Sequence, residues 1–204
     1  MHDSQRDTAR VQALRAAHHA KTEATLRNIA AHLKFIDESG AHLGLTRLFG
    51  RATPGQRVCE ATPGYSGKHY TVIAALGLSE VSATWVLEDA MTREAFDVYV
   101  AQVLAPTLQA GDVVLIDNLN VHKSETARQA IEARGARLEF LPPYSPDLNP
   151  IEKCWAKVKT VLRQLKARTF DELVEALNVA FQAITPEDAR AWFAHCGYLA
   201  PQIN

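Results

Sequence analysis

The sequence has no long hydrophobic run and no closely spaced pair of cysteines. No apolar run approaches the roughly 20 residues that a membrane-spanning helix needs, and residues 1–21 are polar and lack the apolar centre of a signal peptide. We therefore expect a cytoplasmic protein with no membrane partner. Cys59, Cys154 and Cys196 are odd in number and far apart in the chain, which predicts neither a disulfide framework nor a thiolate zinc site.

An excess of basic residues is missing as well. The 204 residues include 22 Lys and Arg and 23 Asp and Glu, so the formal net charge is −1. Dedicated nucleic-acid-binding modules usually carry a strong basic excess. A DNA enzyme fits this balance only if its basic residues are clustered, or if its main DNA-binding domain lies elsewhere.

The residues that are present are typical of one α/β domain. The hydrophobic share of 47% and the charged share of 22% are ordinary for a soluble globular protein, and the length suffices for one domain with a helical arm. The chain has no internal repeat and no low-complexity linker. We expect an Ala- and Arg-rich helical arm over residues 1–32, broken near Thr22, and a single domain over residues 33–204.

Hydrophobic periodicity predicts a hairpin-rich first half, then alternating helices and strands, then further helices. A Pro-rich turn over residues 142–148 precedes the helix that begins near Asn149. The predicted strands are 33–37, 70–78, 83–87, 113–117 and 137–141, with hairpin strands near 43–48 and 57–61, and the predicted helices are 92–108, 123–134, 149–166, 170–184 and 186–195.

Two aspartates end very apolar strands. Asp37 follows residues 33–36, and Asp117 follows residues 113–116. Carboxylates are rarely buried without a partner, and functional groups gather at the carboxyl ends of strands in α/β sheets. Two such carboxylates side by side would repel each other, and a hard cation such as Mg²⁺, which prefers oxygen ligands, would relieve the repulsion. The alternative is that each aspartate begins a turn or caps a helix.

Glu38 stands next to Asp37 and offers a second carboxylate. Neighbouring residues of a strand point to opposite faces of the sheet, so only one of the two can reach a given site. We assign the site to Asp37, because it directly continues the apolar run.

Glu152 stands in the first turn of a predicted helix. Asn149 is a good N-cap residue and Pro150 suits the first helical position, so Asn149 and Glu152 also fit a capping box in which the glutamate only bonds the N-cap amide. The spacing favours a functional role. The 34 residues between Asp117 and Glu152 hold a helix, a strand and a turn, which form one crossover unit that returns the chain beside the Asp117 strand.

Three sequence blocks carry a family resemblance. F-I-D-E-S-G (35–40), L-I-D-N-L-N-V-H-K-S (115–124) and L-P-P-Y-S-P-D-L-N-P-I-E-K-C-W (141–155) resemble the mariner-like superfamily of Asp-Asp-Glu transposases, and among them its bacterial insertion-sequence branch. The third block is the most specific. The resemblance covers roughly residues 33–165, and the 34-residue gap matches the usual spacing of the family.

The resemblance implies an RNase H-like α/β fold, a mixed sheet flanked by helices, here with the N-terminal arm and extra C-terminal helices. It implies that Asp37, Asp117 and Glu152 are the catalytic residues and bind two Mg²⁺ (or Mn²⁺) ions. The implied activity is cleavage of DNA strands and their transfer to target DNA during transposition of an insertion sequence. It further implies a homodimer on DNA, with transposon ends and target DNA as partners and a nucleoid location when DNA is bound.

One departure from the family concerns DNA recognition. Members normally carry helix-turn-helix domains before the catalytic domain, whereas only about 32 residues precede the first catalytic strand here. We expect that half to be separately encoded, or the chain to be a truncated copy. Two alternatives stay open at this point: a domesticated or truncated DNA-binding regulator without activity of its own, and an RNase H-like nuclease or junction resolvase that does not join strands.

Basic residues on the helix of Glu152 are candidate DNA contacts. At about 100° per residue, Lys159, Arg163 and Lys166 point within about 40° of Glu152, and such a strip could neutralise DNA phosphates. The alternative is a solvated surface.

The second block supplies two more candidates. His122 and Lys123 follow the Asp117 strand closely enough to approach the scissile phosphate, or form ordinary polar surface at a helix start. Asn118 and Asn120 belong to the same block and have open roles. Elsewhere we expect Tyr144, Trp85 and Trp192 to pack rather than stack on bases.

Overall fold

The computed structural model describes residues 4–61 and 68–199. These residues form a five-stranded mixed sheet with the strand order β3-β2-β1-β4-β5. β1 pairs with β2 antiparallel and with β4 in parallel, β2 pairs with β3 antiparallel, and β4 pairs with β5 in parallel. The strands are β1 (Leu33–His42), β2 (His69–Leu76), β3 (Val81–Glu88), β4 (Val113–Ile116) and β5 (Arg137–Phe140).

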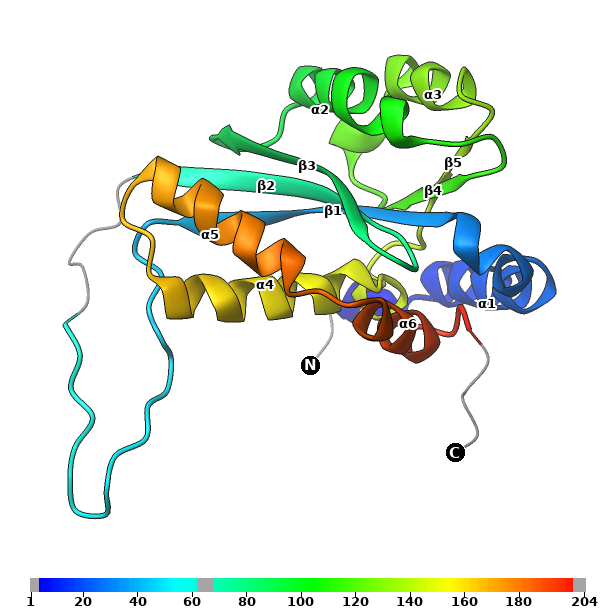
Figure 1. Cartoon of the computed structure of the whole chain (residues 1–204). Helices are drawn as coiled ribbons and strands as arrows, with labels where there is room; N and C mark the ends of the chain where they lie inside the picture. The colour runs from blue at the N-terminus through cyan, green and yellow to red at the C-terminus, as the bar shows by residue number, and fades with distance from the viewer. Residues whose placement is uncertain (1–3, 62–67, 200–204) are drawn as a thin grey trace.

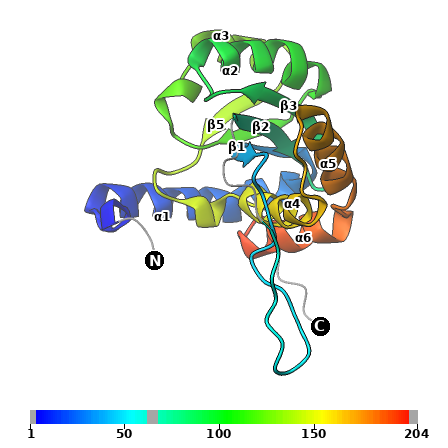
Figure 2. The same cartoon turned by 90° about the vertical axis from the view of Figure 1, so that its left-hand side faces the viewer.

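Helices cover both faces of this sheet. Figures 1 and 2 show α2 and α3 on one face and α4, α5 and α6 on the other. On the first face lie α2 (Arg93–Tyr99), the short helical turns η3 (Val100–Leu104), η4 (Ala105–Thr107) and η5 (Asn120–His122), and α3 (Glu125–Glu132). The other helices are η1 (Ser4–Asp7), α1 (Ala9–Ala24), η2 (Leu26–His32), η6 (Pro146–Leu148), α4 (Ile151–Leu165), α5 (Phe170–Gln182) and α6 (Pro186–His195).

Alternation along the central strands divides the core in two. Phe35 of β1 and Leu115 of β4 are buried in the core that α4, α5 and α6 cover. Their neighbours Ile36 and Ile116 are buried in the core beneath α2 and α3. Because side chains alternate along a strand, the next residues of β1 and β4 point in turn toward the same two faces of the sheet.

The mixed, helix-flanked sheet confirms the predicted fold class, and all the strongly periodic elements form where the sequence predicts them. The predicted hairpin strands at 43–48 and 57–61 are wrong, since residues 43–61 contain no strand. Figures 1 and 2 show this segment extending away from the body. Leu48 and Phe49 are 67% and 89% exposed there, so nothing packs against them to stabilise a ladder.

The N-terminal helical arm, residues 4–32, packs against the domain. The Arg15 guanidinium is buried and donates to both carboxylate oxygens of Asp147 at 3.0 and 2.7 Å and to Ser145 Oγ at 2.6 Å. His18 Nε2 lies 2.8 Å from the Tyr198 hydroxyl, which donates to the Leu148 carbonyl. The arm is therefore fixed to the turn that precedes α4. None of the described helices combines the length and apolar character needed to cross a membrane.

Candidate active site

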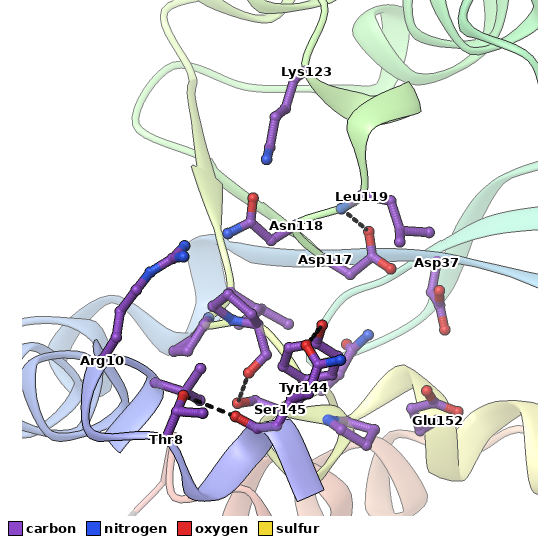
Figure 3. Close-up of a pocket in the computed structure, with 17 residues that line it drawn as sticks. Thr8, Arg10, Asp37, Asp117, Asn118, Leu119, Lys123, Tyr144, Ser145 and Glu152 are labelled. Atoms are coloured by element: carbon purple, nitrogen blue, oxygen red, sulfur yellow. Dashed lines mark hydrogen bonds between the residues drawn. The ribbon is translucent and has the colours of Figure 1, made fainter. Parts of the chain in front are cut away.

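A pocket of about 690 Å³ lies where β1, β4, the start of α4 and the N-terminal arm meet. Asp37, Asp117 and Glu152 all line it. Figure 3 shows their three carboxylates directed toward a common space. Three elements far apart in the sequence thus bring the three predicted site residues to one place.

The parallel pairing of β1 and β4 places the two aspartates. Its last pair is Ile36 opposite Ile116, so Asp37 and Asp117 follow it on neighbouring strands. Alternation puts Asp37 on the face of Phe35, toward α4, and Glu38 on the opposite face. One detail of the prediction is wrong: Asp37 does not end its strand, because antiparallel pairing with β2 carries β1 on to His42.

Glu152 reaches the pocket from the first turn of α4. The capping-box alternative is wrong here, because the N-cap residue of α4 is Pro150 and makes no side-chain cap hydrogen bond. Asn149 is 4% exposed, lines the pocket, and its Oδ1 has no hydrogen-bond partner among the described residues. The start of α4 therefore offers the pocket a carboxylate and an unpaired amide oxygen.

Burial and nearby carboxylates raise the pKa of Asp37 and of Glu152. Burial, and then the charges of Glu152, Glu38 and Asp117, raise the pKa of Asp37 to about 8. Burial also raises the pKa of Glu152, against the lowering effect of Lys159, and Asp117 adds to the rise. A cation placed among these groups would remove the penalty, because an opposite charge favours the ionised form.

The donor set fits a hard divalent cation in its chemistry. Ionised carboxylates only accept hydrogen bonds, and oxygen atoms are the ligands that Mg²⁺ prefers. Within residues 4–61 and 68–199, no three His, Cys, Asp or Glu side chains are grouped tightly enough to hold an ion by themselves. Mg²⁺ usually takes one or two carboxylates together with substrate phosphates and water, so an open arrangement suits a cation that arrives with substrate.

His122 is buried and holds Asp117 in place. Its Nδ1 lies 2.6 Å from Asp117 Oδ1, and its Nε2 lies 2.8 Å from Glu38 Oε1. Burial lowers the pKa of His122, but the hydrogen bonds to Asp117 and Glu38 outweigh it and raise the pKa to about 9. The DNA contact predicted at His122 stays a prediction that its burial disfavours, since the side chain is 0% exposed and packs against Phe96.

Residues 32–174, well over half of the chain, match the family described as DDE superfamily endonuclease. The chain belongs to the DDE superfamily endonucleases. No curated protein matched the sequence.

Solved structures of the Mos1 mariner transposase share the fold of this DDE superfamily endonuclease. The Mos1 catalytic domain matches with a TM-score of 0.69 at 14% identity, covering 96% of this chain and 91% of that one. The Mos1 paired-end complex with left transposon end matches with a TM-score of 0.73 at 17% identity, covering 96% and 60%. The pre-cleavage Mos1 transpososome gives 0.69 at 17% identity, covering 90% and 59%. The chain thus spans about 60% of the length of these longer transposase chains.

The remaining predicted DNA contacts of this DDE superfamily endonuclease differ in position. Lys123 is exposed and lines the pocket. Lys159 is half-buried and close enough to Glu152 to affect its charge. Arg163 is half-buried nearer His42, and Lys166 ends α4 in an ion pair with Glu60. The basic strip therefore leads away from the pocket, and its contact with DNA stays a prediction.

Sequence reasoning missed the part that the N-terminal arm plays in this site. Gln5, Thr8, Arg10 and Val11 line the pocket together with the carboxylates. Tyr144 also lines it, is 41% exposed and donates its hydroxyl to Gln5, whereas Trp85 stacks on Tyr99 and Trp192 packs against the core, as predicted. No local sequence signal marks the arm residues, because their role depends on the long-range docking of the arm.

Proposed function

We propose that this chain is the catalytic part of a DNA transposase that cleaves DNA strands and transfers them to target DNA, using two divalent cations, Mg²⁺ or Mn²⁺, bound by Asp37, Asp117 and Glu152. The observation that carries the proposal is the meeting of these three carboxylates in one open pocket, where burial and mutual repulsion raise the pKa of Asp37 to about 8. Membership of the DDE superfamily endonucleases supports the same reaction class.

The mechanism assigns a separate task to each carboxylate. Two divalent cations supply activation of the attacking oxygen and stabilisation of the leaving oxygen in an in-line displacement at phosphorus. By the family resemblance, Asp37 would serve both cations, while Asp117 and Glu152 would each serve mainly one. Because burial and the neighbouring carboxylates raise the pKa of Asp37 to about 8, a cation bound there would compete with a proton for this carboxylate.

Asp117 is oriented before any ligand arrives. Its Oδ1 accepts from the backbone N–H of Leu119 at 3.1 Å and lies 2.6 Å from His122 Nδ1. Both contacts use the same oxygen, which leaves Oδ2 for a cation. Glu38 holds the other nitrogen of His122, and supporting partners of this kind fix the direction of a metal-binding side chain.

The proposed partners of this chain rest on its similarity to the Mos1 structures. Solved structures of Mos1 include paired-end complexes with the left transposon end, with Mg and with Mn. We propose that this chain likewise acts on DNA ends as a homodimer, in the bacterial cytoplasm at the nucleoid. The chain spans about 60% of those chains, and we propose that a helix-turn-helix half supplies recognition of the ends.

The direct test is nicking of a supercoiled plasmid in Mn²⁺ or Mg²⁺, followed by transfer of a precut 3′-hydroxyl end. Wild-type protein should do both, and Glu152→Gln should do neither while melting like wild type. Glu132→Gln is the matched control, because this carboxylate is exposed on α3 outside the pocket. Nicking without transfer would favour a nuclease, and DNA binding without nicking would favour a regulatory fragment.

A further inference from the structure

One side of the pocket carries positively charged side chains, opposite in charge to the carboxylates. Arg10, Asn118 and Lys123 line it together with the carboxylates. Figure 3 shows their side chains pointing into the pocket from the side away from Asp37 and Glu152. All three present N–H donors, and Arg10 and Lys123 carry positive charge.

The donors of this wall are largely unused by the protein. Among the described residues, Arg10 and Asn118 make no side-chain hydrogen bond or ion pair, and Lys123 Nζ only lies 3.5 Å from Asn120 Oδ1. Several other surface cations of the chain have carboxylate partners, among them Arg6, Lys21 and Lys68. Two cations and an amide without such partners, converging on one pocket, suit an anion with several acceptor oxygens.

The arm holds Arg10 at this place. Arg6 and Arg15, on either side of it in the sequence, both pair with Asp147, at 3.0 and 2.7 Å. Val11, the next residue, is 4% exposed and anchors the helix against the domain. Arg10 is therefore presented by a docked helix, and guanidinium groups fixed in this way bind phosphate oxygens in pairs.

We propose that Arg10, together with Asn118 and Lys123, binds a backbone phosphate of the DNA strand next to the one that undergoes cleavage. The proposal rests on the proposed function, since the carboxylates define where the reacting phosphate lies. It makes the N-terminal arm a part of the active site: the arm supplies the positive wall that positions the strand against the negative one.

The test compares Arg10→Gln, Arg10→Lys and Arg134→Gln by fluorescence anisotropy on a short labelled duplex with a 3′ overhang, without divalent metal, over a range of salt concentrations. Arg10→Gln should lower the affinity about tenfold and reduce the slope of log affinity against log salt by about 0.9, the value of one lost phosphate contact. Arg10→Lys should restore the slope but only part of the affinity, because lysine keeps the charge and loses the paired geometry. Arg134 is exposed outside the pocket, so its variant should match wild type.

The outcomes separate this proposal from the proposed function. If Arg10→Gln keeps wild-type affinity and salt slope while Glu152→Gln abolishes nicking, the phosphate site is wrong and the transposase proposal stands. If inorganic phosphate competes with the duplex only in wild type, and duplex affinity without competitor is equal in both proteins, the site takes free phosphate and the proposal is overturned. If Arg10→Gln melts at a lower temperature, Arg10→Lys decides: an unchanged salt slope with reduced affinity supports the proposal, and full wild-type affinity contradicts it.

Discussion

Asp37 and Glu38 are consecutive carboxylates on one strand, yet they lie in opposite environments. Asp37 faces an open pocket together with two other carboxylates, and its pKa is raised to about 8 by burial and by those neighbours. Glu38 faces the other side of the sheet and contacts a fully buried imidazole, His122, at 2.8 Å. In the first arrangement the ionised form of Asp37 is disfavoured unless a cation binds, and in the second the pKa of His122 is raised to about 9, which favours its cationic form beside Glu38. Because side chains alternate along the strand, Asp37 becomes a candidate metal ligand, whereas Glu38 becomes the partner of the histidine that orients Asp117.

The largest expected effect separates the two residues by activity. Asp37→Asn should abolish metal-dependent nicking, because the amide cannot supply a charged oxygen to a cation. Glu38→Gln should keep measurable nicking with a roughly 10- to 100-fold loss, the usual range for groups that orient a metal ligand. Plasmid nicking rates over a range of Mn²⁺ concentrations give both numbers. An equal loss of nicking activity in the two variants would show that Asp37 and Glu38 do not differ as metal ligand and supporting residue.

The second effect is the pH dependence of stability without divalent metal. Folded Asp37 keeps a proton that the unfolded chain loses near pH 4, so stability should fall as the pH rises from about 4 to about 8. Protonated His122 contributes stability that is complete below pH 6.5 and lost as the pH rises through about 9. Both contributions have the same sign, and Asp37 alone accounts for a change on the order of several kcal/mol.

Urea unfolding at a series of pH values measures this dependence. Asp37→Asn should flatten the curve below about pH 6.5 and leave the part due to His122 at higher pH. Stability that rises with pH across this window in wild-type protein would contradict the raised pKa of both groups.

A smaller loss of stability should follow His122→Ala. Removing the imidazole leaves Glu38 and Asp117 without their shared cation, and Glu38 is only 15% exposed. Loss of one partner from a buried pair costs about 3–5 kcal/mol, and the 36% exposure of Asp117 reduces this to about 2–3 kcal/mol. The free energy of unfolding at pH 6 is the readout. The control variant His19→Ala, at an exposed position of α1, should change the free energy of unfolding by less than about 0.5 kcal/mol. A similarly small change in His122→Ala would show that the contacts of His122 with Glu38 and Asp117 contribute little to stability.

The smallest expected effect concerns the basic strip on α4. Replacing Lys159 and Arg163 together by Gln should reduce the slope of log DNA affinity against log salt by an amount equivalent to up to about two phosphate contacts. An unchanged slope in anisotropy measurements would remove both residues from the DNA-binding surface and confine the cationic contacts to the pocket.

Local patterns predicted most of the fold. Apolar runs such as Val113–Ile116 and the helical spacing on α4 are strong signals because they reflect burial, and the structure confirms them. The run from residue 43 to 61 misled the prediction, because its glycines, prolines and apolar pairs suggest a hairpin, while a ladder needs packing that the exposed Phe49 does not have.

Within the site, alternation and spacing favoured Asp37, Asp117 and Glu152, the family resemblance carried the assignment, and all three line one pocket. Alternation and spacing were not enough for Arg10 or His122. Arg10 lines the pocket because the arm docks on the domain, where Arg6 and Arg15 both pair with Asp147, and such long-range contacts leave no periodic trace. His122 follows a polar stretch typical of a surface, and only the three-dimensional packing of Phe96 and Glu38 buries it.

The most direct measurement of the central claim is anomalous diffraction from crystals of the protein soaked in Mn²⁺ with a short DNA duplex. We predict manganese peaks in contact with carboxylate oxygens of Asp37, Asp117 and Glu152, and loss of those peaks in Asp37→Asn crystals. Peaks elsewhere on the protein, or peaks at this pocket that persist in Asp37→Asn, would contradict it.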